Sequence, residues 1–79
     1  MKISIHSLKN TLFDGSAEKL IVRTPAGQIT VLDHHLPMVT VLSGPAVEIA
    51  SSTGEKTVVP MSGGFLEVRP ESEVVILAQ

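Results

Sequence analysis

Apolar residues along this chain recur at every second position or in short β-branched runs, and glycine or proline interrupts these runs repeatedly. No window holds the i, i+3, i+4, i+7 spacing of an amphipathic helix. Period-two alternation turns one face of a strand inward and the other outward. The chain is therefore expected to be all-β, a small two-sheet β-sandwich of roughly eight to ten short, mostly antiparallel strands.

Individual strands and turns can be placed on this pattern. Ile3 and Ile5 alternate with polar neighbours and predict a first strand with one inward face. Asp14-Gly15 is a tight-turn signal, and a second turn is expected at Thr24-Pro25-Ala26-Gly27. Pro60 cannot donate a ladder hydrogen bond, so its strand should lie at an edge or carry a bulge there.

Size and composition limit what the fold can do. With 79 residues, no repeat and no linker, residues 1–79 are expected to form one β-sandwich domain with a small core. The chain has no cysteine, which excludes disulfides and a thiolate zinc site. A net charge of −2 without a basic block argues against nucleic acid as a partner. Without a membrane-length apolar run or a signal-peptide pattern, we expect a soluble intracellular protein that does not insert into the membrane.

The candidates for catalytic chemistry are weak. Asp33-His34-His35 is the only cluster of potential metal ligands, but adjacent residues of an extended segment point to opposite faces. We read it as a polar connection between strands. Ser62 precedes Gly63-Gly64 without forming a nucleophile elbow, and these glycines predict a bulge or tight bend. No glycine-rich phosphate loop is present, and no metal, cofactor or catalytic residue is predicted.

A small barrel that binds single-stranded nucleic acid is the natural rival among small β folds. Such barrels stack bases on exposed aromatic side chains. This chain has two aromatic residues, Phe13 and Phe65, and both are expected in the core. The aromatic content therefore argues against this rival.

One segment has apolar residues on both faces. Leu36, Met38 and Leu42 share the face opposite Val39 and Val41. If the two valines belong to the core, the first group is exposed and marks a surface that binds another protein. The alternative is that the strand is covered on both faces. The sequence leaves these two interpretations open.

Several short motifs together resemble one family. The segment 27–37, Gly-Gln-Ile-Thr-Val-Leu-Asp-His-His-Leu-Pro, is similar to a glycine-rich segment of the ATP synthase epsilon subunit that ends in Pro-Gly-His-Ala-Pro. Residues 62–68, Ser-Gly-Gly-Phe-Leu-Glu-Val, resemble its Gly-Gly-Phe-Leu-Glu-Val run, residues 74–78 resemble its closing strand, and residues 12–15 its Phe-Ser-Gly turn. The matches occur in the same order and cover nearly the whole chain.

This resemblance implies a non-catalytic subunit in the central stalk of an F-type ATP synthase. Its partners would be the gamma subunit and the c-ring, and its role would be to couple proton or sodium translocation to ATP synthesis or hydrolysis by rotation. The implied location is peripheral, on the cytoplasmic face of a bacterial inner membrane or its stromal or matrix equivalent. Carried over residue by residue, the contacts are Ser7 and Gln28 on the c-ring side and, on the gamma side, His35, Leu36, Met38, Thr40 and Leu42.

The family usually continues into a helical hairpin, whereas this chain stops at Gln79, so we expect a short form without that tail. Two other functions stay open. One is a generic β-sandwich module that binds an unrelated protein. The other is a small metal-dependent enzyme that uses His34 or His35.

Overall fold

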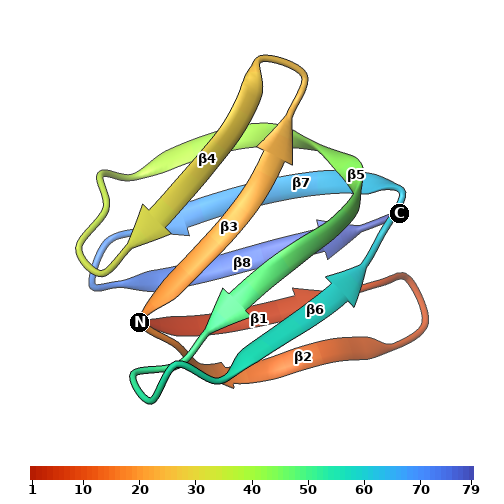
Figure 1. Cartoon of the computed structure of the whole chain (residues 1–79). Coiled ribbons are helices and arrows are strands. Elements are labelled where there is room, and N and C mark those ends of the chain that lie inside the picture. Colours follow the sequence, from red (N-terminus) through yellow and green to blue (C-terminus); the bar gives the residue numbers. More distant parts are fainter.

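The computed structural model describes residues 1–79 and contains eight strands and no helix, which confirms the all-β prediction (Figure 1). Six of the seven strand pairs are antiparallel, and the N-terminal strand β1 runs parallel to the C-terminal strand β8. The strands are β1 (Lys2–His6), β2 (Thr11–Ser16), β3 (Lys19–Thr24), β4 (Gly27–Leu32), β5 (Met38–Ala50), β6 (Lys56–Pro60), β7 (Gly63–Arg69) and β8 (Glu73–Ala78).

The strands form two layers that share β5. Layer one has the order β2-β1-β8-β7 and ends on the first half of β5, residues 38–43. Layer two contains β4, β3, the second half of β5 and β6. Figure 1 shows layer two crossing in front of β1, β8 and β7. Because β5 is hydrogen-bonded in both layers, the sandwich is one continuous folded sheet.

The corner of this sheet lies at Gly44-Pro45, in the middle of β5. A Cβ atom on Gly44 would lie 2.7 Å from the carbonyl oxygen of Met61, closer than side-chain carbons approach. The backbone of β5 therefore passes directly against the segment between β6 and β7. This close approach needs glycine at the corner and lets one strand serve both layers.

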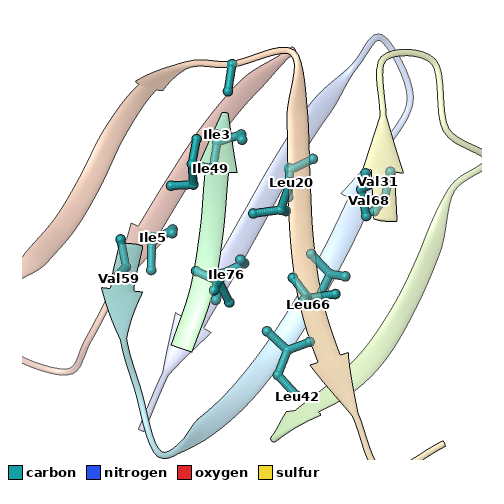
Figure 2. Packing of buried hydrophobic residues seen from close by; sticks show 14 of the residues in the cluster. Ile3, Ile5, Leu20, Val31, Leu42, Ile49, Val59, Leu66, Val68 and Ile76 are labelled. Carbon is teal, nitrogen blue, oxygen red and sulfur yellow. The ribbon is translucent and has the colours of Figure 1, made fainter. Parts of the chain in front are cut away.

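The core fills the space between the layers, as the labelled side chains in Figure 2 show. Alternate residues of each strand contribute to it, as period-two alternation predicts. Ile3 and Ile5 are fully buried, which confirms the inward face of the first strand. The other buried apolar residues are Ala17, Leu20, Val22, Val31, Leu42, Val47, Ile49, Val59, Met61, Leu66, Val68, Val74 and Ile76.

Two details of the sequence-based prediction were wrong and one was confirmed. Asp14-Gly15 lies within β2, opposite Ser4 and Ile3 of β1, and the chain turns earlier, at residues 7–10. Phe65 is exposed instead of buried, whereas Phe13 packs against the core. Pro60 ends β6, which pairs with β5 alone and is an edge strand, as expected.

Strand β7 begins with two glycines, and the close approach of β8 requires the second of them, Gly64. A Cβ atom at this position would collide with the carbonyl oxygen of Leu77 on β8. The predicted tight bend is therefore a close approach of two paired strands, which no side chain can share.

Candidate partner-binding surface

The first half of β5 presents the opposite face from the one expected for a docking strand. Leu42 is 3% exposed and belongs to the core, and Met38 is half-buried and packs against it. Thr40 shares this inward side and is half-buried. Val39 and Val41 point outward and are 73% and 50% exposed. The sequence left the exposure of Met38 and Leu42 open, and the structure places both on the inward side.

The register of β5 against β3 gives the physical reason. Ile21 and Arg23 of β3 are two positions apart, but their partners Glu48 and Ser43 on β5 are five positions apart. The corner of β5 thus carries three extra residues, an odd number that inverts the alternation between its halves. Val47 and Ile49 are buried after the corner, so the even-numbered residues are buried before it.

The outward side of layer one carries a continuous apolar surface. Strand pairing aligns Val41 with Phe65 and Leu77 in one row, and Val39 with Glu67 and Val75 in the next. Four of the five apolar side chains are at least half exposed, and Val75 is partly covered. We call this surface, composed of Val39, Val41, Phe65, Val75 and Leu77, the apolar outer face.

A shallow depression of about 460 Å³ lies in the apolar outer face between β5, β7 and β8. Its polar rim is a row of charges. Arg69 Nε lies 3.1 Å from Glu67 Oε1, and Arg69 Nη1 lies 3.7 Å from Glu73 Oε1. One arginine thus bridges two carboxylates, and Lys2 is aligned with Glu73 on the neighbouring strand, so the rim carries charges of both signs. The depression suits an apolar side chain with charged groups beside it.

A rigid turn extends this surface at one end. Ser7 N donates to Asn10 O at 2.8 Å, and Asn10 N donates to the Ser7 hydroxyl oxygen at 3.1 Å. Between them Leu8 is 99% exposed. A second depression of about 300 Å³ lies between this turn and β8, and it shares Leu77 with the apolar outer face. The turn therefore continues the apolar outer face beyond the end of β1.

The two residues expected on the c-ring side lie toward the same end of the sandwich but in different layers. Ser7 follows β1, whose last residue His6 is aligned with Leu77 near the end of β8. Gln28 is exposed at the start of β4, opposite Arg23, and Arg23 is aligned with Ser43 just before the β5 corner. Ser7 and Gln28 make no direct contact in the hydrogen-bond network. They therefore lie at the same end of the molecule but do not form a single site.

The residues expected on the gamma side begin at the opposite end, in the connection from β4 to β5. His35 N donates to Leu32 O at 3.1 Å, and His35 Nδ1 donates to Leu36 O at 2.8 Å. His35 is half-buried, and Leu36 is 80% exposed. Together with Met38, Thr40 and Leu42 they do not form one surface, because the strand residues face inward.

The same connection contains a carboxyl group with a lowered pKa. A hydrogen bond from the Ser72 hydroxyl lowers the pKa of the Asp33 carboxyl, burial opposes this shift, and the N-terminal ammonium, 3.6 Å away, lowers the pKa further. Asp33 is therefore a carboxylate at neutral pH and a polar anchor of this connection.

The structure offers no set of ligands for the metal-dependent enzyme alternative. No three His, Asp or Glu side chains come together anywhere in the chain. His34 Nδ1 lies 3.2 Å from the Ser72 hydroxyl, and His35 Nδ1 contacts a backbone carbonyl. Both rings thus make local hydrogen bonds, as expected for a polar connection between strands.

The outward side of layer two has a different character. It exposes Leu32 and Val58, but charged and polar residues separate them. Lys56 Nζ lies 3.1 Å from Glu48 Oε1 across the β5–β6 pair, and Lys19 stands between Leu32 and Ala50 in the register. The apolar residues of layer two are therefore isolated, whereas those of layer one adjoin one another.

Comparisons with known protein sequences give one consistent family. The family described as ATP synthase, Delta/Epsilon chain, beta-sandwich domain matches residues 1–79. The ATP synthase epsilon chain of Exiguobacterium sp. is 39% identical over 67 residues, 85% of this chain and 48% of the relative. That of Alkalihalophilus pseudofirmus is 34% identical over 79 residues, 100% of this chain and 58% of the relative. The chain thus spans about half the length of these curated relatives.

Solved structures share the architecture. A chain in the mitochondrial ATP synthase of Euglena gracilis superposes with a TM-score of 0.89 at 23% identity, covering 96% of this chain and 48% of that one. A chain in the central stalk and c-ring structure of the Tetrahymena thermophila mitochondrial ATP synthase has a TM-score of 0.79 at 16% identity, covering 100% and 63%. At these identities the likeness establishes the fold alone.

Proposed function

Because this chain belongs to the β-sandwich family of ATP synthase delta and epsilon chains, as the sequence motifs indicated, we propose that it is a non-catalytic central-stalk subunit of an F-type ATP synthase. In this role it docks the gamma subunit to the c-ring. It thereby couples proton or sodium translocation to ATP synthesis or hydrolysis by rotation. The family match along residues 1–79 supports the subunit role, and the surfaces of the sandwich support the docking role.

The observation that carries the docking role is the apolar outer face of layer one. Single exposed apolar residues are normal on a protein surface, but adjoining ones mark interaction sites. Here Val41, Phe65 and Leu77 form one unbroken row across three strands. A flat sheet face with an apolar centre and a charged rim has the composition of a protein interface.

We assign the gamma subunit to this face. The apolar depression with its charged rim around Arg69 favours a partner that presents an apolar side chain flanked by charged residues. His35 and Leu36 extend the contact at one end of the sandwich and Leu8 at the other. Among the gamma-side residues implied by the sequence, Leu42, Met38 and Thr40 then act from behind, by holding β5 in place, while Val39 and Val41 make the contact.

The c-ring is assigned to the end of the sandwich that carries Ser7 and Gln28. Both residues are polar, and Ser7 lies on the connection from β1 to β2 and Gln28 at the start of β4, where short polar loops of a partner can approach. An end contact to the ring and a face contact to gamma can be made at the same time. Because β5 belongs to both layers, force applied at the end passes through paired strands to the apolar outer face.

A matched pair of substitutions tests this assignment. Val41→Glu places a charge in the apolar outer face, whereas Val58→Glu places it on layer two at nearly equal exposure, 50% against 53%. We expect Val41→Glu to weaken binding to purified gamma by at least about tenfold, because a charge would be buried unpaired. Val58→Glu should bind normally. Equal binding by both variants would overturn the assignment of gamma to layer one.

The same binding measurement, made on the wild-type chain, distinguishes the docking role from the alternative of a generic interaction module. A wild-type chain that does not bind gamma, measured by calorimetry or co-purification, would favour the module with an unrelated partner.

No helix in the structure is long and apolar enough to cross a membrane. We infer a peripheral location through the c-ring, on the cytoplasmic face of a bacterial membrane or its matrix or stromal equivalent.

A further inference from the structure

Three residues with positive φ gather at one end of the sandwich, and none of them is glycine. His34 has a φ of 62°, Glu71 of 65° and Ser72 of 57°. L-residues with a Cβ atom enter this region rarely, and glycine or asparagine usually occupies it. Both Glu71 and Ser72 lie in the turn from β7 to β8, whereas His34 lies in the connection from β4 to β5.

Hydrogen bonds join these two segments, which are 38 residues apart in the sequence. His34 N donates to the Ser72 hydroxyl oxygen at 3.1 Å. The same oxygen lies 3.2 Å from His34 Nδ1. One serine side chain therefore holds both the backbone and the ring of His34.

Backbone strain of this kind persists where the surrounding contacts require a particular conformation. At position 72, glycine would avoid the strain but would lack the hydroxyl. Serine accepts the strained conformation, and its side chain contacts the connection at two points, His34 N and His34 Nδ1. The hydroxyl is thus the feature of this turn that glycine cannot supply.

We propose that Ser72 is a positioning residue that fixes the connection Asp33–Leu36 in the shape that binds gamma. The inference rests on the proposed docking function. His34 N is held by Ser72, and the next residue closes its own turn through His35 N and Leu32 O at 3.1 Å. Leu36, 80% exposed, is presented directly after these two anchors. The hydrogen bonds of Ser72 thereby determine where Leu36 and the His35 ring lie beside the start of β5.

The decisive variant is Ser72→Gly, because it removes the hydroxyl and relieves the backbone strain at once. A purely structural role predicts a melting temperature that changes in step with binding. Our inference predicts a separation: the melting temperature stays equal or rises, while binding to purified gamma weakens about tenfold. Glu71→Gly is the matched control, since it relieves the neighbouring strain and keeps the hydroxyl. It should bind gamma like the wild type.

Amide hydrogen exchange provides a readout that does not depend on gamma. The His34 and His35 amides should exchange at least about tenfold faster in Ser72→Gly than in the wild type and Glu71→Gly. Ser72→Ala should show the same exchange and the same loss of binding, without relief of strain. Unchanged exchange in Ser72→Gly, or wild-type affinity for gamma, would overturn the inference. If the wild type itself fails to bind gamma, the proposed function falls and the docking role of Ser72 falls with it.

Discussion

The neighbouring residues Val41 and Leu42 give the sharpest test of the fold, because they occupy opposite sides of one strand. Leu42 is 3% exposed in the core, and Val41 is 50% exposed on the apolar outer face. Leu42→Ala removes about three methylene-sized groups, which amounts to about 2.4 kcal/mol of transfer free energy. The cavity left behind raises the expected loss to about 3 to 4 kcal/mol.

This loss is large for so small a domain. At about 0.05 to 0.15 kcal/mol per residue, a chain of 79 residues has a free energy of unfolding of about 4 to 12 kcal/mol. Leu42→Ala should therefore lower the melting temperature by roughly 12 to 32 °C. Val41→Ala removes atoms that are half in water already, so its cost should stay below about 1 kcal/mol.

Urea unfolding followed by circular dichroism measures both variants under one condition. With a slope of about 1 kcal/mol per molar urea, Leu42→Ala should move the midpoint by about 3 to 4 M and Val41→Ala by less than about 1 M. If the odd number of extra residues at the β5 corner did not invert the alternation, Val41 would be the buried residue. The order of the two variants would then be reversed, and that result would refute the assigned orientation of β5.

Two further predictions concern the glycine in β7 and the carboxylate beside Ser72. Gly64→Ala should destabilise by more than about 2 kcal/mol, because its Cβ atom would collide with the Leu77 carbonyl oxygen; an unchanged urea midpoint would contradict this close approach. The lowered pKa of Asp33 means that its stabilising contribution is present above the unfolded-state pKa and is lost as the pH falls through the folded-state pKa. The wild type should therefore be more stable than Asp33→Asn at pH 7 and lose this advantage below about pH 4, and a difference independent of pH would argue against the hydrogen bond from Ser72.

Much of the fold follows from local patterns that one strand contains by itself. The polar neighbours of Ile3 and Ile5 settle which face of β1 is buried. Pro60 likewise identifies an edge strand, because a missing N–H has the same consequence in any sheet. The family motifs indicate the same architecture. One of them contains Gly64, and the close approach of β8 requires glycine at that position. These predictions need no knowledge of which strands pair.

The orientation of the first half of β5 could not be predicted in this way. Residues 38–42 contain no charge that would mark one side as the surface, and both sides are apolar enough to be buried. The deciding feature is the count of residues at the corner, which emerges only when β5 is paired with β3. Position in the sequence alone therefore could not show that Met38, Thr40 and Leu42 face inward.

Phe65 differs, because a local signal for its exposure was present. It shares its side of β7 with Glu67 and Arg69, while Leu66 and Val68 occupy the other. Two charged residues on one side of a short strand make that side the outward one, whatever the third residue is. The charged side of β7 therefore predicts that Phe65 is exposed. The general preference of aromatic residues for cores obscured this signal.

The contrast between the two layers is consistent with the proposed role, in which one sandwich holds two partners at once. In layer two, Lys19 and the Glu48–Lys56 pair separate the exposed apolar side chains, so water can surround each of them. In layer one, the corner of β5 brings Val41 next to Phe65, and the apolar side chains adjoin. A core of this size leaves little stability in reserve, and a partner that covers the apolar outer face adds stability by linkage. In the proposed role, gamma bound to the apolar outer face therefore also stabilises the domain, while the end with Ser7 and Gln28 remains accessible to the ring.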